Sequence, residues 1–374
     1  MFIDVLLQNL VLETNWFLDK NNSFYLFLIT IMDINLLKKL SESCGVSGFE
    51  SEVREVIKKE ISKYADSVTE DRLGNLIVLK KGSGKNKKKI ALVAHMDEVG
   101  LIVKRIDKGF IEFSKMGGID DRILLTQRVL IKGNSDIEGI IGSKPIHLQK
   151  EEERKKLVKY DEMYIEVGFT EKEKSKVEIG TPISFKSEFK ELRNNLFVGK
   201  SLDNRLGVYC LIDLIKNIKT TKDDIYFVFS TQEEVGLKGA RTAVYAIDPD
   251  LAIVIDTAIA GDVPAVTEKD TEIKLGKGVS ITLVEAEGRG MILPEKLKEF
   301  VFDLAKKNKI KYQVELVEGG MTDTAVVQII KKGILSLSIN IPLRNMHTPN
   351  EIFNVKDLEE TIKFAGLIIK NWKY

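Results

Sequence analysis

Residues 90–100, IALVAHMDEVG, contain the strand and the polar turn that decide the fold. The segment 90–94 is an unbroken apolar run, which is typical of a strand buried on both faces of a sheet. His95 and Asp97 follow it directly. In open α/β sheets, ligands bind beyond the carboxyl ends of the strands. The stretch therefore predicts an α/β sheet with a polar site at the end of this strand.

Segments on both sides of this strand alternate between helical and strand patterns. Apolar residues at helical spacing predict helices, and short apolar runs predict strands. The predicted helices are 50–64, 206–218, 239–246, 294–307, 322–331 and 355–372, with a further helix starting after Asp33, a candidate N-cap. The predicted strands are 75–79, 90–94, 224–230, 251–255 and 334–341.

Residues 104–190 have a different pattern. Short alternating or β-branched runs, separated by Gly, Asp and Asn, predict a small antiparallel β-barrel; they lie at 110–113, 128–132, 137–141, 164–169 and 182–185. The charged run 150–159 is interpreted as a mobile loop. We therefore expect residues 104–190 to be a barrel inserted into a discontinuous catalytic domain made of 32–103 and 191–374.

The first 31 residues are unlike the rest of the chain. Their apolar stretch, 24–32, is about nine residues long, well below the ~20 that a membrane-spanning helix needs. No small-residue cleavage site follows it. Because Met32 begins a run that resembles a natural N-terminus, we expect translation to start there and residues 1–31 to be an extension outside the native protein.

The composition excludes several kinds of partner and site. The chain has 374 residues, with 57 Lys and Arg against 56 Asp and Glu, so it lacks the basic excess that nucleic acid or an anionic membrane requires. Two cysteines exclude a disulfide framework and a Cys-rich zinc site. We expect no nucleic-acid partner, no membrane association and a cytoplasmic location.

Four predicted strands each deliver a histidine or a carboxylate near the same end. These residues are His95, the pair Glu233 and Glu234, Asp256 and His347, and Asp203 joins them near the start of helix 206–218. Two imidazoles and several carboxylates, without a thiolate, suit two divalent ions such as Zn²⁺, Co²⁺ or Mn²⁺. Two such ions, bridged by one carboxylate, would activate a water for hydrolysis at neutral pH.

Local spacing indicates roles for some of these residues. In His95-Met-Asp97 the carboxylate can accept the ring N–H and fix the tautomer. In the pair Glu233-Glu234 one carboxylate can bind a metal while the other acts as general base. For His147, in the barrel region, a structural role is favoured. Thr322 and Asp323 open a predicted helix and are interpreted as capping residues, with a substrate-pocket role as the alternative.

Five segments carry a family resemblance: AHMDEVG (94–100), SLDNRLG (201–207), TQEEVGLKGA (231–240), VIDTA (254–258) and NMHTPNE (345–351). In this order they resemble the M42 family of dinuclear metallo-aminopeptidases, the tetrahedral-peptidase group. The resemblance runs from about Met32 to the C-terminus. It implies a mixed-sheet, phosphorylase/hydrolase-like α/β domain carrying an inserted β-barrel dimerisation domain.

The same resemblance implies roles for individual residues. Asp203 would bridge two metal ions, with His95 and Asp256 completing one site and Glu234 and His347 the other. Glu233 would be the general base, and Asp97 would support His95. The implied cofactors are two divalent ions per subunit, Zn²⁺ or Co²⁺.

The implied function is removal of N-terminal residues from short peptides, by a homo-oligomer of dimers that assemble into a tetrahedral dodecamer. Three alternatives stay open. A dinuclear deacylase or amidohydrolase would use the same ligands on an N-blocked substrate. A glycosidase would use paired carboxylates without metal. A metal-stabilised scaffold would have no turnover. The sequence does not fix the preferred N-terminal residue.

Overall fold

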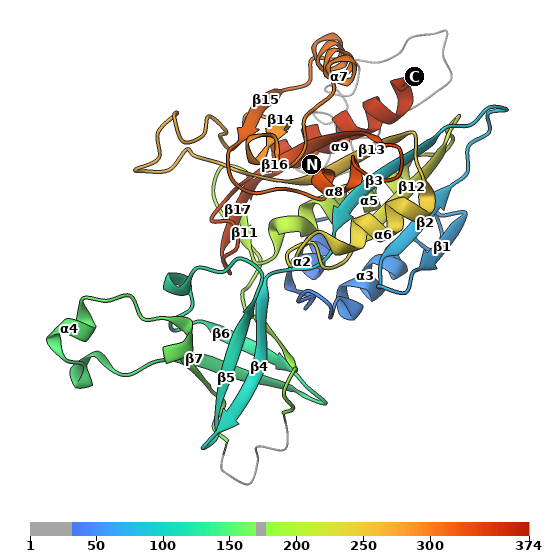
Figure 1. The fold of residues 1–374 in the computed structure, drawn as a ribbon. Helices are drawn as coiled ribbons and strands as arrows, with labels where there is room; N and C mark the ends of the chain where they lie inside the picture. The colour runs from blue at the N-terminus through green and yellow to red at the C-terminus, as the bar shows by residue number, and fades with distance from the viewer. Residues whose placement is uncertain (1–31, 170–176, 374) are drawn as a thin grey trace, which may run out of the picture. The chain divides into compact units, whose positions relative to one another are not determined.

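The computed structural model describes residues 32–169 and 177–373. The predictions for residues 1–31 lie outside the described residues. Within the described part, the chain folds into an eleven-stranded mixed sheet with helices packed on it and a closed six-stranded barrel (Figure 1). None of the helices described there combines the length and the apolar character needed to cross a membrane.

Four parallel strands form the centre of the sheet. In spatial order they are β12 (Asp224–Ser230), β3 (Lys89–His95), β13 (Leu251–Ile259) and β16 (Leu335–Arg344). The other strands extend the sheet: β1 (Ser67–Glu70), β2 (Leu76–Lys80), β10 (Lys190–Glu191), β11 (Leu196–Gly199), β14 (Val279–Glu285), β15 (Tyr312–Val317) and β17 (Glu351–Asn354). Because Ser230 is in register with His95, the carboxyl ends of β12 and β3 lie side by side.

Helices cover both faces of this central sheet. They are α2 (Ile34–Glu42), α3 (Ser51–Ile61), α5 (Leu202–Asn217), α6 (Lys238–Ile247), α7 (Glu295–Lys307), α8 (Thr324–Val327) and α9 (Val355–Asn371). Val93, Val228 and Val254 share one core cluster with residues of α6 and α8. Side chains alternate along a strand, so Leu92 and Phe227 point to the opposite face, where α5 packs on β3. Burial on both faces explains the continuous apolar runs of these strands.

The barrel strands follow the order β4-β5-β8-β7-β6-β9 and are drawn in teal to green in Figure 1. Their bounds are β4 (Gly100–Asp107), β5 (Phe110–Met116), β6 (Arg128–Lys132), β7 (Asp136–Gly142), β8 (Tyr164–Glu166) and β9 (Pro182–Phe185). Alternate residues such as Val129 and Ile131 point inward and are fully buried. The predicted fold class, a mixed α/β sheet with a small β-barrel, is confirmed.

Two sequence predictions were wrong in detail. The charged run 150–159 contains a short helix, α4 (Glu151–Arg154), whose start is held by the carboxylate of Glu153 accepting the Lys150 N–H at 2.7 Å. The helix predicted at 322–331 is only the single turn α8. There the N–H of Ile330 bonds to Val327 three residues back, and Lys331 turns left-handed with φ 53°, so the helix cannot continue.

Asp357 in α9 anchors the long connection between β13 and β14. Its two carboxylate oxygens accept the N–H groups of Gly276 and Gly278, each at 2.7 Å. The side chain is buried, and this burial raises the pKa of Asp357 to about 6, against 3.8 for an exposed aspartate. The folded state therefore binds a proton at Asp357 more tightly than the unfolded chain does.

This difference predicts a pH-dependent stability for the wild-type chain. As the pH rises from about 4 to 6, the ionised Asp357 costs the folded state about 3 kcal/mol, at about 1.4 kcal/mol per pKa unit, and above pH 6 the cost stays constant. In Asp357→Asn this loss is absent. Urea unfolding of both proteins between pH 4.5 and 7.5 should show the wild type losing stability relative to the variant. Parallel pH profiles would contradict the prediction.

Candidate active site

The carboxyl ends of the four central strands bring the predicted site residues together. His95 is the last residue of β3, and Glu233 and Glu234 lie in the turn after β12. His347 lies between β16 and β17. Asp256 lies inside β13, which continues to Ile259, and not after the strand as its sequence pattern suggested. Asp203 is at the start of α5, in a residue whose φ of −77° and ψ of 105° are non-helical.

Asp203 lies between the two imidazoles. Its Oδ1 is 3.2 Å from Nε2 of His95, and its Oδ2 is 3.6 Å from Nε2 of His347. One carboxylate thus directs one oxygen toward each ring. This is the arrangement that a bridging ligand between two ions requires.

Each imidazole has a second carboxylate of its own. Asp256 Oδ1 is 3.6 Å from His95 Nε2, and Glu234 Oε2 is 3.3 Å from His347 Nε2. His95, Asp203 and Glu234 each offer a ligand atom within 4.8 Å of the others. The residues present, with imidazole nitrogens and carboxylate oxygens, fit borderline divalent ions.

The carboxylates around His95 and His347 carry more negative charge than nearby positively charged side chains neutralise. Asp203, Glu233 and Asp256 are buried, and within residues 32–169 and 177–373 no Lys or Arg forms an ion pair with any of them or with Glu234. Burial and the nearby Asp203 raise the pKa of Glu234 well above its usual range. Because buried charges need a partner of opposite sign, the site favours cations.

The pKa of His95 reflects the same excess of carboxylates. Burial opposes protonation of this imidazole, but the carboxylates of Glu233 and Asp256 outweigh burial and raise the pKa of His95 well above its usual range. A cation at this position would replace the proton that these carboxylates attract.

Asp97 connects His95 to the turn that carries Glu233 and Glu234. Its Oδ1 lies 3.5 Å from His95 Nδ1 and accepts the N–H of Glu233 at 3.0 Å. Its Oδ2 accepts the N–H of Glu234 at 3.2 Å and the hydroxyl of Ser47 at 2.6 Å. Burial would raise the pKa of Asp97, but the bonds from His95, Ser47 and the backbone lower it. Asp97 therefore fixes the backbone of the Glu233 turn as well as facing the His95 ring.

The barrel contributes to the site through a backbone group. The carbonyl oxygen of Gly118, just after β5, lies 2.9 Å from Nδ1 of His347. A carbonyl only accepts hydrogen bonds, so Nδ1 carries a proton in this bond, and in the neutral imidazole the Nε2 lone pair then faces Asp203 and Glu234. No sequence pattern indicated Gly118, because its contribution is a backbone oxygen and not a side chain.

Glu351 is a further site residue that sequence reasoning left without a role. Its carboxylate accepts the N–H groups of Asp203 and His347. It is the last residue of the segment NMHTPNE, so its place four residues after His347 was the available signal.

Three further residues that the sequence singled out, His147, Thr322 and Asp323, are not among the proposed metal ligands. His147 is exposed in a short 3₁₀ turn, Ile146–Leu148. Thr322 accepts the N–H of Thr324 at 3.2 Å, as a capping residue does. Asp323 does not cap, because it is buried and accepts the hydroxyl of Ser230 at 2.7 Å; burial raises the pKa of Asp323 to about 7.

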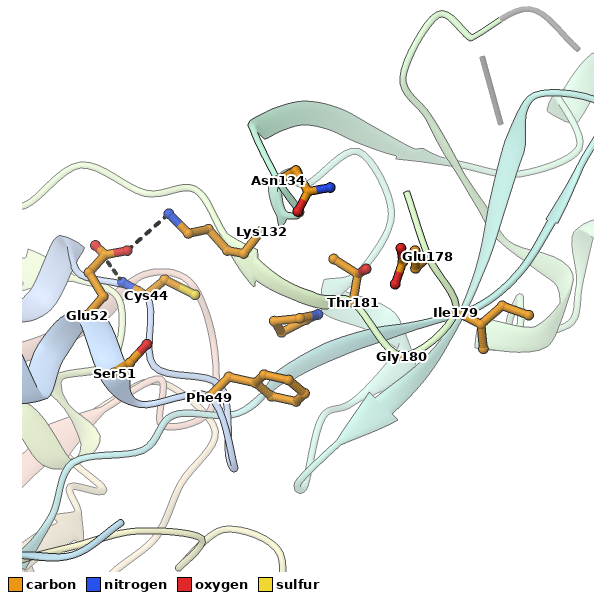
Figure 2. Close-up of a pocket in the computed structure, with 12 residues that line it drawn as sticks. Cys44, Phe49, Ser51, Glu52, Lys132, Asn134, Glu178, Ile179, Gly180 and Thr181 are labelled. Atoms are coloured by element: carbon orange, nitrogen blue, oxygen red, sulfur yellow. Dashed lines mark hydrogen bonds and ion pairs between the residues drawn. The ribbon is translucent and has the colours of Figure 1, made fainter. Parts of the chain in front are cut away.

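A cavity of about 460 Å³ lies away from this cluster, between the start of α3 and the barrel. Figure 2 shows Phe49, Glu52 and Lys132 lining it, with Lys132 reaching Glu52, an ion pair of 3.0 Å. None of the predicted site residues lines this cavity.

Comparisons with known proteins show which family the chain resembles over most of its length. The family model described as M42 glutamyl aminopeptidase matches residues 74–364. Lysyl aminopeptidase from Pyrococcus furiosus is 33% identical over 352 residues, covering 92% of this chain and 98% of that protein. The TET aminopeptidase from a marine sediment Thaumarchaeota archaeon is 36% identical, with a TM-score of 0.87 and coverage of 91% of this chain and 96% of that one.

A further solved structure resembles the chain over almost its whole length. It is the TET1 peptidase of Pyrococcus horikoshii, which is 32% identical, with a TM-score of 0.81 and coverage of 91% of this chain and 99% of that one. The family match and these relatives together show that the chain belongs to the M42 peptidase family and is an aminopeptidase, a hydrolase of peptide bonds.

Proposed function

We propose that this aminopeptidase works with two divalent ions, bridged by Asp203. His95 and Asp256 would hold one ion, and Glu234 and His347 the other. The observation that carries the proposal is the position of Asp203, with one oxygen toward each imidazole and a further carboxylate beside each ring. When bound, the ions supply Lewis acidity to the scissile carbonyl and to the attacking water.

Glu233 is the general base in this proposal. Its carboxylate accepts no hydrogen bond from any described residue, and its Oε2 is 4.0 Å from His95 Nε2. Burial, together with Asp256, raises the pKa of Glu233 well above its usual range. A free carboxylate with a raised pKa can take a proton from water and pass it to the leaving amine. Glu234, whose Oε2 is 3.3 Å from His347, serves as a ligand instead.

The substrates in this proposal are short peptides with a free N-terminus. The experiment that tests the reaction uses metal-stripped protein, with Zn²⁺, Co²⁺ or Mn²⁺ added back separately. The compounds assayed are aminoacyl amides, the same amides with an acetylated N-terminus, and an oligosaccharide. We expect activity on the free amides only, lost on stripping and restored by Co²⁺ or Zn²⁺.

Each alternative function predicts a different result. Faster hydrolysis of the acetylated amides would favour a deacylase. Cleavage of the oligosaccharide that survives metal removal would favour a glycosidase. Absence of turnover with every ion would favour a metal-stabilised scaffold.

We also propose that the chain forms a homo-oligomer through its barrel. The related Pyrococcus horikoshii TET1 peptidase can assemble into a tetrahedron or a large octahedral shell. In this chain the barrel region exposes large apolar side chains, including Ile140 at 54% and Leu148 at 70%. Exposed apolar side chains of this size would be buried by contacts with other subunits. Light scattering that shows a monomer at micromolar concentration would contradict this assembly.

A further inference from the structure

The carboxylate of Glu351 accepts hydrogen bonds from the backbone N–H groups of two proposed metal ligands, Asp203 and His347. Its Oε2 accepts the N–H of Asp203 at 3.0 Å, and its Oε1 accepts the N–H of His347 at 2.8 Å. We propose that Glu351 is a positioning residue that holds the bridging carboxylate and one terminal imidazole at a fixed separation. This inference rests on the proposed two-metal function and adds a residue to it.

Both backbone segments that Glu351 joins have irregular backbone conformations at the residue that it contacts. His347 has φ 59°, a left-handed value that costs a non-glycine residue of the order of 1 kcal/mol or more. Asp203 is non-helical within α5, so its N–H is available for a bond outside the helix. The bonds to Glu351 therefore add support at the one residue of each segment that carries a proposed ligand.

Glu351 is itself fixed by the sheet. It is the first residue of β17, where it is in register with Gly199 at the end of β11. The chain passes from Gly199 to Asp203 in four residues, and from His347 to Glu351 in four residues. Both ligand segments thus leave neighbouring strands, and Glu351 joins them where the strands meet.

A carboxylate is the side chain that this position requires. Two separate N–H donors need two acceptor oxygens, and the carboxyl group of Glu351 presents one oxygen to each. An amide would turn an NH₂ group toward one of the backbone N–H groups. Glu351 is 2% exposed, so bulk water cannot replace the lost bond.

Metal affinity tests this role. In Glu351→Gln we expect the affinity for Zn²⁺ to fall about 10–100-fold, the usual effect of removing a group that orients a ligand. Competition with a chromophoric chelator measures the affinity directly. At saturating Zn²⁺, kcat should return to within a few-fold of wild type, because every ligand and Glu233 are still present.

Two further variants separate positioning from general stability. Asp357→Asn is a matched control, since Asp357 also is buried and accepts two backbone N–H groups. Those groups belong to Gly276 and Gly278, neither of which is a proposed ligand. We expect this control variant to bind Zn²⁺ as the wild type does. Glu351→Asp keeps two oxygens on a shorter side chain and should weaken binding less than Glu351→Gln; it serves as the test if the glutamine variant does not fold.

The outcomes distinguish the positioning role from the two-metal proposal. Wild-type affinity in Glu351→Gln, or in Glu351→Asp where only that variant folds, overturns the positioning role. So does an equal loss of affinity in Asp357→Asn, because the effect would then be one of general stability. Failure of the wild-type chain itself to bind two ions contradicts the proposed function, and this role with it.

Discussion

Glu233→Gln should lose most of its turnover and keep both metal ions. The amide has the size of the carboxylate but cannot accept a proton from water, and general base catalysis typically contributes about 10²–10⁴-fold to the rate. The Glu233 carboxylate accepts no hydrogen bond from described residues, so its replacement breaks no such contact. kcat on an aminoacyl amide and metal content measured on the same sample test the expectation.

The neighbouring residue provides the matched control. Glu234→Gln changes the same group one position along the same turn, but Glu234 lies 3.3 Å from His347 and is a proposed ligand. This variant should bind metal more weakly and regain part of its activity at high metal concentration. Full activity in Glu233→Gln would rule out Glu233 as the base. Loss of metal from Glu233→Gln would make it a ligand instead.

Asp203→Ala should lose both ions together. The two oxygens of Asp203 face different imidazoles, so one substitution removes a ligand from each proposed site. We expect the loss of affinity to exceed the about 10–100-fold typical of a residue that only supports a ligand. Metal content after dialysis, measured by plasma mass spectrometry, should approach zero per subunit.

A stability measurement adds an independent readout for Asp203. In metal-free protein the burial of Asp203 is outweighed by His95 and His347, which lower the pKa of this carboxylate, so its ionised form stabilises the fold, and the variant should melt below metal-free wild type. Asp256→Ala is the comparison, because Asp256 lies near His95 alone among the imidazoles and should release a single ion. Two ions retained by Asp203→Ala would contradict the bridging role.

The central part of the fold could be predicted because burial of a strand on both faces requires consecutive apolar residues, which can be recognised in the sequence. Strands covered on both faces, such as β3 and β12, need continuous apolar residues, and polar residues at their ends are then conspicuous. Strands β14 and β15 were not predicted. The exposed and half-buried positions of β15 include Glu315 and leave no continuous apolar run.

The parts of the site that sequence reasoning missed depend on backbone groups. Gly118 acts through its carbonyl oxygen, and Glu351 acts on the N–H groups of two residues distant from each other in the chain. Neither contact leaves a pattern of residue types. Asp203 and His347 could be identified as candidates because their side chains carry the chemistry, whereas the groups that orient them become visible only when strands β11, β16 and β17 are placed side by side.

The bond from His347 to the Gly118 carbonyl has a consequence for protein engineering. A barrel transplanted from a relative, or shortened to a linker, must still present a carbonyl at this point, since otherwise the imidazole can rotate or exchange its tautomer. Designers who treat the insertion as an interchangeable module would therefore also remove the backbone group that orients a proposed metal ligand.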